Sequence, residues 1–220
     1  MEIFNSKSKK VITEDQDDIL IKTPTNGAII SKCMSVNGDV KSCEPITVEG
    51  HIVGDILCED IVVILYGGSI TGKIEAKEVR VDGRVEGPIE AKIVEQTKTA
   101  NHEGYILADI GILNGVTDGD IVCRETLEIG QDANIECYEC KAEIITVDGK
   151  LNGNITASKL LEARESATLK GKIKVKELKS EAGSKILGSI ENFESSNIIN
   201  KKLNTTSSLD TTTKEARRLG

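Results

Sequence analysis

Residues 83–89 read Gly-Arg-Val-Glu-Gly-Pro-Ile, and this frame returns along most of the chain at nearly constant spacing. Residues 50–56 read Gly-His-Ile-Val-Gly-Asp-Ile, and residues 68–74 read Gly-Ser-Ile-Thr-Gly-Lys-Ile. Further copies begin at Ala100, Gly115, Gly149 and Ala167, with looser copies at Met34, Ala133 and Gly183. Steps between copies run from about 15 to 18 residues, which is typical of one coil of a β-solenoid.

Aligning the copies places like residues in columns. An aliphatic column holds Val40, Ile56, Ile74, Ile89, Ile106, Ile121, Ile155 and Ile173. Two residues before it stands a glycine column: Gly38, Gly54, Gly72, Gly87, Gly104, Gly119, Gly153 and Gly171. Two residues after it stands a column of mostly small residues: Ser42, Cys58, Ala76, Ala91, Ala108, Cys123, Ala157 and Val175. Alternate residues of a strand share a face, so the three columns lie on one side.

Such columns predict an all-β, single-stranded parallel β-helix of about ten short coils, each stacked about 4.8 Å from the next. The aliphatic residues then pack on one another along the bore, and the glycine and small-residue columns fit where a coil bends. An antiparallel sandwich also alternates apolar and polar residues. It gives no reason, however, for the same residue type to recur in register.

Composition limits the function classes. The 220 residues carry a formal net charge of −8, and the pI near 5.0 argues against nonspecific nucleic-acid binding, which requires a basic face. The longest aliphatic run, Ile61 to Leu65, is too short to span a bilayer. Because no apolar secretory segment follows Met1, we expect a cytosolic protein.

The sequence suggests three regions. Residues 1–28 stand outside the repeat, 29–194 form the β-helix, and 195–220 form a Ser/Thr/Lys-rich tail with a net charge of +3 that we expect to be disordered. One coil breaks the columns, because Cys137 and Glu139 stand where glycine and isoleucine are expected. Either this coil bulges or an insertion near Tyr138 shifts its register. The last coil needs one inserted residue to bring Gly188 and Ile190 into frame.

Cysteine and histidine residues are the candidate metal ligands. Cys58 and Cys123 fall in the small-residue column as buried thiols, while Cys137 and Cys140 form a lone C-x-x-C, a weak zinc signal without a second pair. We therefore expect no metal, no cofactor and reduced thiols. His102 occupies a position that is Ile or Val in other coils, which favours a tolerated coil residue over a catalytic base.

Three local matches resemble the bactofilins, a family of bacterial polymer-forming cytoskeletal proteins. They are residues 36–40, 79–91 and 147–157, of which the V-x-G-x-V-x-G-x-I-x-A form is the most specific. The resemblance covers roughly residues 30–193. It implies a right-handed parallel β-helix that polymerises end to end without nucleotide, often on the inner membrane surface. It also implies service to cell shape, cell-wall enzyme placement or polarity. This chain has more coils than a typical member.

The resemblance also implies roles for single residues. An N-terminal apolar patch ahead of lysines is similar to the family's membrane-targeting segment; its residues here are Met1, Ile3, Phe4, Lys7, Lys9 and Lys10. A phenylalanine just past the last coil is similar to the family's polymer-contact aromatic, which here is Phe193. The partners implied are further copies of the chain, inner-membrane lipid, and cell-wall or polarity proteins.

Solenoid ends expose unpaired backbone and an open core, and monomeric solenoids usually cap them. No capping helix is apparent here, and both ends are apolar. The candidate polymerisation residues are Ile29, Ile30, Met34 and Val36 at one end and Ile186, Ile190 and Phe193 at the other. The alternative is that residues 19–21 and the C-terminal tail fold over these ends.

Two other function classes compete with a polymer. Hexapeptide acyltransferases are also β-solenoids, but with a strict six-residue beat that these coils do not keep. The related carbonic anhydrases need three histidine ligands, whereas this chain has only His51 and His102. No P-loop or nucleophile-elbow motif is present, so we expect no enzyme. A monomeric β-helix adaptor that binds one regulator stays open.

Overall fold

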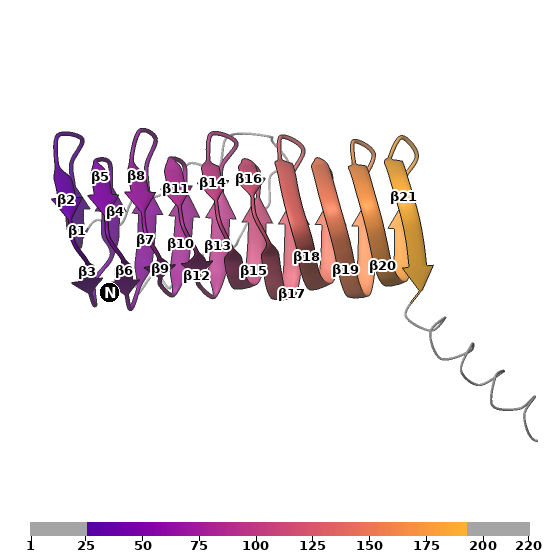
Figure 1. The fold of residues 1–220 in the computed structure, drawn as a ribbon, viewed down its shortest axis with the longest axis horizontal. Coiled ribbons are helices and arrows are strands. Elements are labelled where there is room, and N and C mark those ends of the chain that lie inside the picture. Colours follow the sequence, from indigo (N-terminus) through magenta and orange to yellow (C-terminus); the bar gives the residue numbers. More distant parts are fainter. Residues whose placement is uncertain (1–25, 193–220) are drawn as a thin grey trace, which may run out of the picture.

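The computed structural model describes residues 26–192 and shows a parallel β-solenoid of about ten coils. Every coil contributes a strand to each of three parallel stacks, and each strand pairs with the equivalent strand of the next coil. Figure 1 shows the coils lying side by side along one rod, with the first coil at one end and β21 at the other. Within the described residues every strand pairing is parallel, so the antiparallel sandwich is excluded.

We label the three stacks A, B and C in the order in which the chain passes through them in each coil. Stack A begins with β1 (Ala28–Ile30), β4 (Ile46–Val48), β7 (Ile61–Ile64), β10 (Glu78–Val81) and β13 (Ile93–Gln96). Stack B begins with β2 (Ser35–Asn37), β5 (His51–Val53), β8 (Ser69–Thr71), β11 (Arg84–Glu86), β14 (Asn101–Glu103) and β16 (Val116–Asp118). Stack C begins with β3 (Val40–Ser42), β6 (Ile56–Cys58), β9 (Ile74–Glu75) and β12 (Ile89–Glu90).

In the later coils the strands run on through the corners, so one strand serves two or three stacks. These strands are β15 (Ile106–Leu113), β17 (Ile121–Ile129), β18 (Asn134–Val147), β19 (Lys150–Ala163), β20 (Thr168–Ser180) and β21 (Lys185–Asn192). The register shifts at the corners, for example between Ala108 and Ile110 and between Ala157 and Leu160. The extra corner residues that vary the coil length are therefore absorbed outside the paired segments.

The predicted columns are confirmed as stacked neighbours. Ile56 pairs with Val40 and Ile74, and Ile89 pairs with Ile74 and Ile106, so the aliphatic column runs along the bore in stack C. The isoleucines of this column from Ile56 to Ile173 are buried. Full burial of one such side chain contributes about 1.5–3 kcal/mol. The core is therefore a narrow column of aliphatic side chains, which fits a chain with 2% aromatic residues.

Glycine is required at the corner between stacks B and C. Gly87 adopts a φ of +136°, which residues with side chains rarely adopt, and a Cβ there would overlap the carbonyl oxygen of Gly72 in the coil before. The same close approach recurs from Gly54 to Gly188. The prediction that this column marks a bend without room for a side chain is confirmed.

The irregular coil is explained by an insertion. Asp118 pairs with Glu136, but Ile121 pairs with Cys140, so the second strand holds one residue more between these pairs. Tyr138 is the additional residue and is 79% exposed. Cys140 thereby takes the place of isoleucine in the bore. In the last coil the expected insertion is absent, because residues 168–175 pair with residues 185–192 without a register shift and the turn places Ser184, not Gly183, opposite Ala167.

The glycine corner generates a prediction with a matched control. Gly87→Ala should lower the free energy of unfolding by more than Gly38→Ala. Both positions have nearly the same φ, +136° and +135°, but no atom lies within 4 Å of a Cβ built on Gly38. The backbone strain of about 1–3 kcal/mol is shared, and only Gly87→Ala adds a steric overlap. Thermal unfolding at low protein concentration measures the difference; equal losses would contradict the stacking argument.

Candidate assembly surfaces

The N-terminal end of the rod is the first coil, whose strands β1, β2 and β3 pair on one side only among residues 26–192. Ile29 is 64% exposed and Met34 is also exposed, while Val36 is half-buried. Ile52, which pairs with Val36 from the next coil, is buried. Ile30 is buried as well, at 9% exposure. Three of the four predicted N-terminal residues therefore present apolar surface at this end.

The C-terminal end is formed by β21, which pairs with β20 and has no second strand beside it among residues 26–192. Ile190 is 51% exposed and Ile186 is half-buried, although their column neighbours Ile173 and Leu169 are buried. Leu187 is 57% exposed and was not singled out by the sequence pattern, because it points away from the bore. Phe193 and the proposed membrane patch, Met1, Ile3, Phe4, Lys7, Lys9 and Lys10, lie outside the described residues.

These ends combine two features that favour association. Edge strands leave backbone N–H and C=O groups without a ladder partner. Beside them the open bore presents apolar side chains that are covered in every inner coil. A second strand that paired with such an edge would satisfy the backbone and cover the apolar residues together. The geometry thus suits β-strand addition at both ends of the rod.

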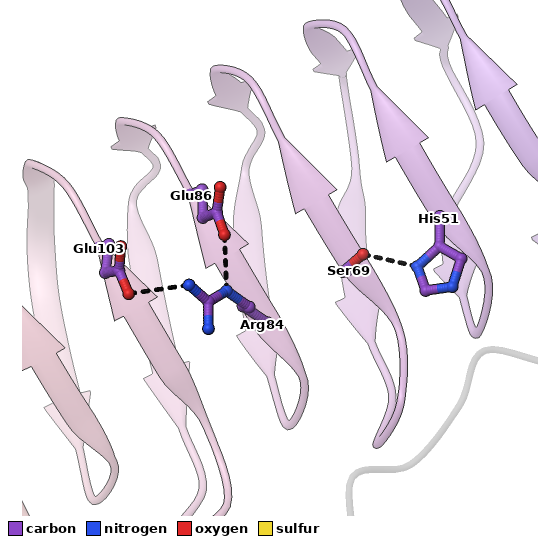
Figure 2. A network of polar contacts seen from close by, with 5 residues as sticks. All are labelled: His51, Ser69, Arg84, Glu86 and Glu103. Carbon is purple, nitrogen blue, oxygen red and sulfur yellow. Dashed lines mark hydrogen bonds and ion pairs between the residues drawn. The ribbon is translucent and has the colours of Figure 1, made fainter.

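The outward surface of stack B, along the side of the rod, carries polar contacts between side chains. His51 Nδ1 lies 2.6 Å from Ser69 Oγ, and Arg84 bonds Glu86 at 2.7 Å and Glu103 at 2.9 Å (Figure 2). The contacts of His51 with Ser69 and of Arg84 with Glu103 join neighbouring coils of stack B, whereas Arg84 and Glu86 lie on the same strand, β11, as Figure 2 shows. His51 is thus an exposed surface residue. The surface around Arg84 is therefore polar and charge-paired, while single exposed apolar side chains such as Leu57 and Val116 lie elsewhere along the rod.

The inserted corner makes an open hollow on this side, lined by Asp118, Asp120, Glu136, Cys137, Tyr138 and Asn152. Asp120 Oδ1 accepts backbone hydrogen bonds from Tyr138 at 3.0 Å and Glu139 at 2.8 Å. This carboxylate therefore holds the backbone of the insertion in place. Among residues 26–192 no group of three or more His, Cys, Asp or Glu side chains could hold a metal ion.

The cysteines are free thiols with distinct surroundings. Cys58 and Cys123 are buried as the small-residue column predicted, and burial raises the pKa of Cys123 to about 12. The Cys140 thiol bonds to Cys137, which lowers the pKa of Cys137, and this contact together with burial raises the pKa of Cys140. The C-x-x-C is thus a thiol pair with one partner in the bore.

His102 lies inside the core with two other polar residues, Gln96 and Thr117. Its Nε2 lies 3.0 Å from the carbonyl oxygen of Gly87, and its Nδ1 has no hydrogen-bond partner. Thr117 donates to Gln96 Oε1 at 2.9 Å. Because the ring is enclosed and pairs with Val85 and Thr117 in neighbouring coils, it faces no solvent-accessible cleft. This arrangement fits a coil residue and not a general base.

Burial lowers the pKa of His102 below its ordinary value of 6.5. The folded state therefore binds fewer protons than the unfolded state just below pH 6.5, and stability should fall as the pH drops from 6.5 towards the folded pKa. We predict that His102→Val removes this loss and raises the melting temperature, since valine fills the same column at Val85. Thermal unfolding of both proteins between pH 5 and 8 provides the check. Parallel pH profiles would contradict it.

Within residues 26–192 no helix is long and apolar enough to cross a membrane. No curated protein and no solved structure matches the chain. The sequence model of one family does match, described as bactofilin, polymer-forming cytoskeletal. It matches twice, over residues 28–112 and 107–191, and together the matches span nearly the whole described rod. A parallel β-solenoid with exposed apolar side chains at both ends of the described residues is consistent with that description. The chain therefore belongs to the bactofilin family of polymer-forming cytoskeletal proteins.

Proposed function

We propose that this protein is a non-enzymatic cytoskeletal scaffold that assembles end to end into filaments without nucleotide. The observation that carries the proposal is the exposure of apolar side chains at both ends of the rod, with the bore residue Ile190 51% exposed at one end and Ile29, beside the buried Ile30, 64% exposed at the other. Membership of a polymer-forming family supports the same conclusion. Exposed apolar side chains along the rod, such as Leu57 and Val116, lie between charged or polar neighbours of the adjacent coils, so growth along the rod axis is favoured over growth from the side.

The contact residues of this proposal are those at the two ends. Ile29, Ile30, Met34 and Val36 supply one surface, and Ile186, Ile190 and Phe193 supply the other. Leu187 joins the second surface on the strength of its exposure. Burial of these side chains in a contact supplies the hydrophobic driving force, and pairing of the edge strands supplies direction.

The proposed location is the inner face of the cytoplasmic membrane. Met1, Ile3 and Phe4 would enter the lipid surface, and Lys7, Lys9 and Lys10 would face anionic headgroups. One such patch binds weakly, but a filament displays many copies and gains avidity. A filament fixed there would place cell-wall or polarity proteins and so support cell shape.

An arginine at the C-terminal end tests polymerisation. Ile190→Arg should give folded rods that do not form filaments, because a charge buried in an apolar contact costs more than the roughly 1.4 kcal/mol that corresponds to a tenfold weaker contact. Phe193→Arg should act in the same way. Tyr138→Arg, on the side of the rod, is the matched control and should leave filaments intact. Negative-stain microscopy and sedimentation report the outcome.

The competing adaptor reading predicts a different result from the same wild-type protein. Light scattering at rising concentration should show growing mass for a polymer and a fixed mass for a monomeric adaptor. A rod of constant mass at all concentrations would refute the proposed polymer. Filaments of the Ile190→Arg variant would refute the assigned contact alone.

Membrane attachment is tested by deleting residues 2–10. Filaments of the truncated protein should form normally but no longer co-sediment with liposomes that contain anionic phospholipid. Wild-type filaments and filaments with Lys7, Lys9 and Lys10 changed to serine serve as comparisons, which separate the apolar from the electrostatic contribution. Unchanged pelleting of the truncated filaments would remove the targeting role.

A further inference from the structure

One column of stack A faces away from the bore along the whole rod. In the first four coils it holds Ile29, Thr47, Val63 and Arg80, each paired with the next. From Arg80 to Lys179 every member of the column is half-buried or exposed, as a side chain that borders water should be. Thr47 and Val63 differ, because Thr47 is only 6% exposed and Val63 is 0% exposed. We call the outer face of β4 and β7 around these two residues the covered face.

Val63 does not owe its burial to the bore. Val62 and Ile64 on either side of it belong to the hydrophobic core, and alternate residues of a strand point to opposite faces, so Val63 faces outward. Neighbouring coils alone do not bury an aliphatic side chain at this position, since Ile112 stands in the same column of a later coil and keeps exposed surface. A further segment therefore lies across the covered face.

Residues 26–192 contain no segment that could form this cover. Connections between consecutive strands in this range are at most four residues long, as at residues 65–68, and each turns the chain at a corner. The strands of this range all belong to the three stacks. Because the face is buried in a single copy of the chain, the cover comes from the parts of the chain on either side of this range.

The N-terminal segment joins the rod next to the covered face. The backbone N–H of Ala28 donates to the carbonyl oxygen of Pro45 at 2.9 Å, and Pro45, the residue before β4, is itself buried. The apolar run closest to this point in the sequence is Ile-Leu-Ile at residues 19–21, and it ends five residues before Asn26. Five extended residues span up to about 18 Å. Because the third coil lies only about 10 Å from the first, this run can reach Val63.

The C-terminal segment cannot reach the covered face with its first apolar pair. It leaves the rod at Asn192 in the last coil, about 34 Å along the axis from Val63 in the third. The pair that follows Phe193 is Ile198 and Ile199. The chain from Asn192 to Ile199 spans at most about 25 Å when extended. The N-terminal segment is therefore the occupant that fits.

The exposure of the first coil places the cover on the side of the rod and not over its end. Ile29 is 64% exposed and Met34 is exposed as well, although both belong to the coil that an end cap would shield. Thr47 and Val63, in the second and third coils, are the residues that lose their exposed surface. A cover at this place crosses the outer face of stack A and leaves the edge strands of the first coil open.

We propose that residues 19–21 dock on the covered face of the same chain, with their apolar side chains packed over Thr47 and Val63. These three residues form a lateral strap over the second and third coils. The residues before the strap, which include the candidate membrane patch, then leave the rod from its side beside stack A and not from its end. The docking does not depend on polymerisation or on lipid binding, so it is tested without either.

Thiol labelling of the full chain tests the strap. In Val63→Cys the new thiol should react with iodoacetamide more slowly than the thiol of Ile112→Cys, the matched control in the same column. Changing residues 19–21 together to serine should speed the reaction of Val63→Cys by about tenfold or more, because the strap no longer protects the thiol, and should leave Ile112→Cys unchanged. Changing Ile198 and Ile199 to serine should alter neither rate. Mass spectrometry of peptides separates the probe from the native cysteines, and circular dichroism verifies the fold.

Each other outcome of the labelling overturns the proposal. If Val63→Cys reacts as fast as Ile112→Cys in the otherwise unchanged chain, the face is open in solution. If the thiol stays protected when residues 19–21 are serine, another segment covers it. If the serine changes in the C-terminal segment expose the thiol instead, that segment is the occupant. If protection is lost on dilution, a second copy of the chain covers the face.

Proteolysis gives an independent readout at Lys22, which directly follows the strap. Docking should protect the peptide bond after Lys22 from trypsin. Val63→Asp places a charge under the strap and should speed this cleavage by about tenfold or more. Ile112→Asp, the matched control, should leave cleavage at the wild-type rate, and cleavage after Lys10, ahead of the strap, should be equal in all three proteins. Equal cleavage after Lys22 in the two aspartate variants would contradict the docking.

Discussion

The rod depends on one constraint, the parallel backbone pairing of each coil with the coil before it at equivalent positions. This pairing fixes the distance between coils at about 4.8 Å and sets like residue against like residue. It makes a corner glycine necessary, because the carbonyl of Gly72 lies where a Cβ of Gly87 would be. It also turns one aliphatic position per coil into a continuous core. The register shifts of the described strands lie at corners between paired segments, so the extra residues do not interrupt the hydrogen-bonded ladder.

Two of the three stacks were readable from the sequence because their residue types repeat. The columns through Gly87, Ile89 and Ala91 lie in stack C and at the corner before it, and the structure confirms each of them. Stack A was not recognised from the pattern. Its bore positions are also mostly aliphatic, as at Val62 and Val94. Their distance from stack C is not constant, however, with six residues from Ile56 to Val62 and five from Ile89 to Val94, so the column does not align when the coils are aligned on stack B.

The irregular coil shows a second limit of the sequence. A missing glycine and isoleucine at Cys137 and Glu139 indicated either a bulge or an insertion, and only the pairing of Ile121 with Cys140 decides between them. The environment of His102 was hidden for a similar reason. Its contact, the carbonyl of Gly87, lies in another coil, and its burial follows from the register. Chain ends were predictable as apolar, but the exposure of Leu187 required the coordinates.

Ten coils at about 4.8 Å give the subunit a length of about 48 Å along the rod axis. In a filament built from such subunits, coil number sets the axial repeat, and side features such as Tyr138 would recur once in each repeat. A relative with fewer coils would carry a shorter repeat even if its end surfaces were identical. Lateral partners that bind at two successive subunits would then distinguish the two filaments by spacing alone. The number of coils therefore determines the spacing of lateral binding sites along a filament, independently of the residues that form the end contacts.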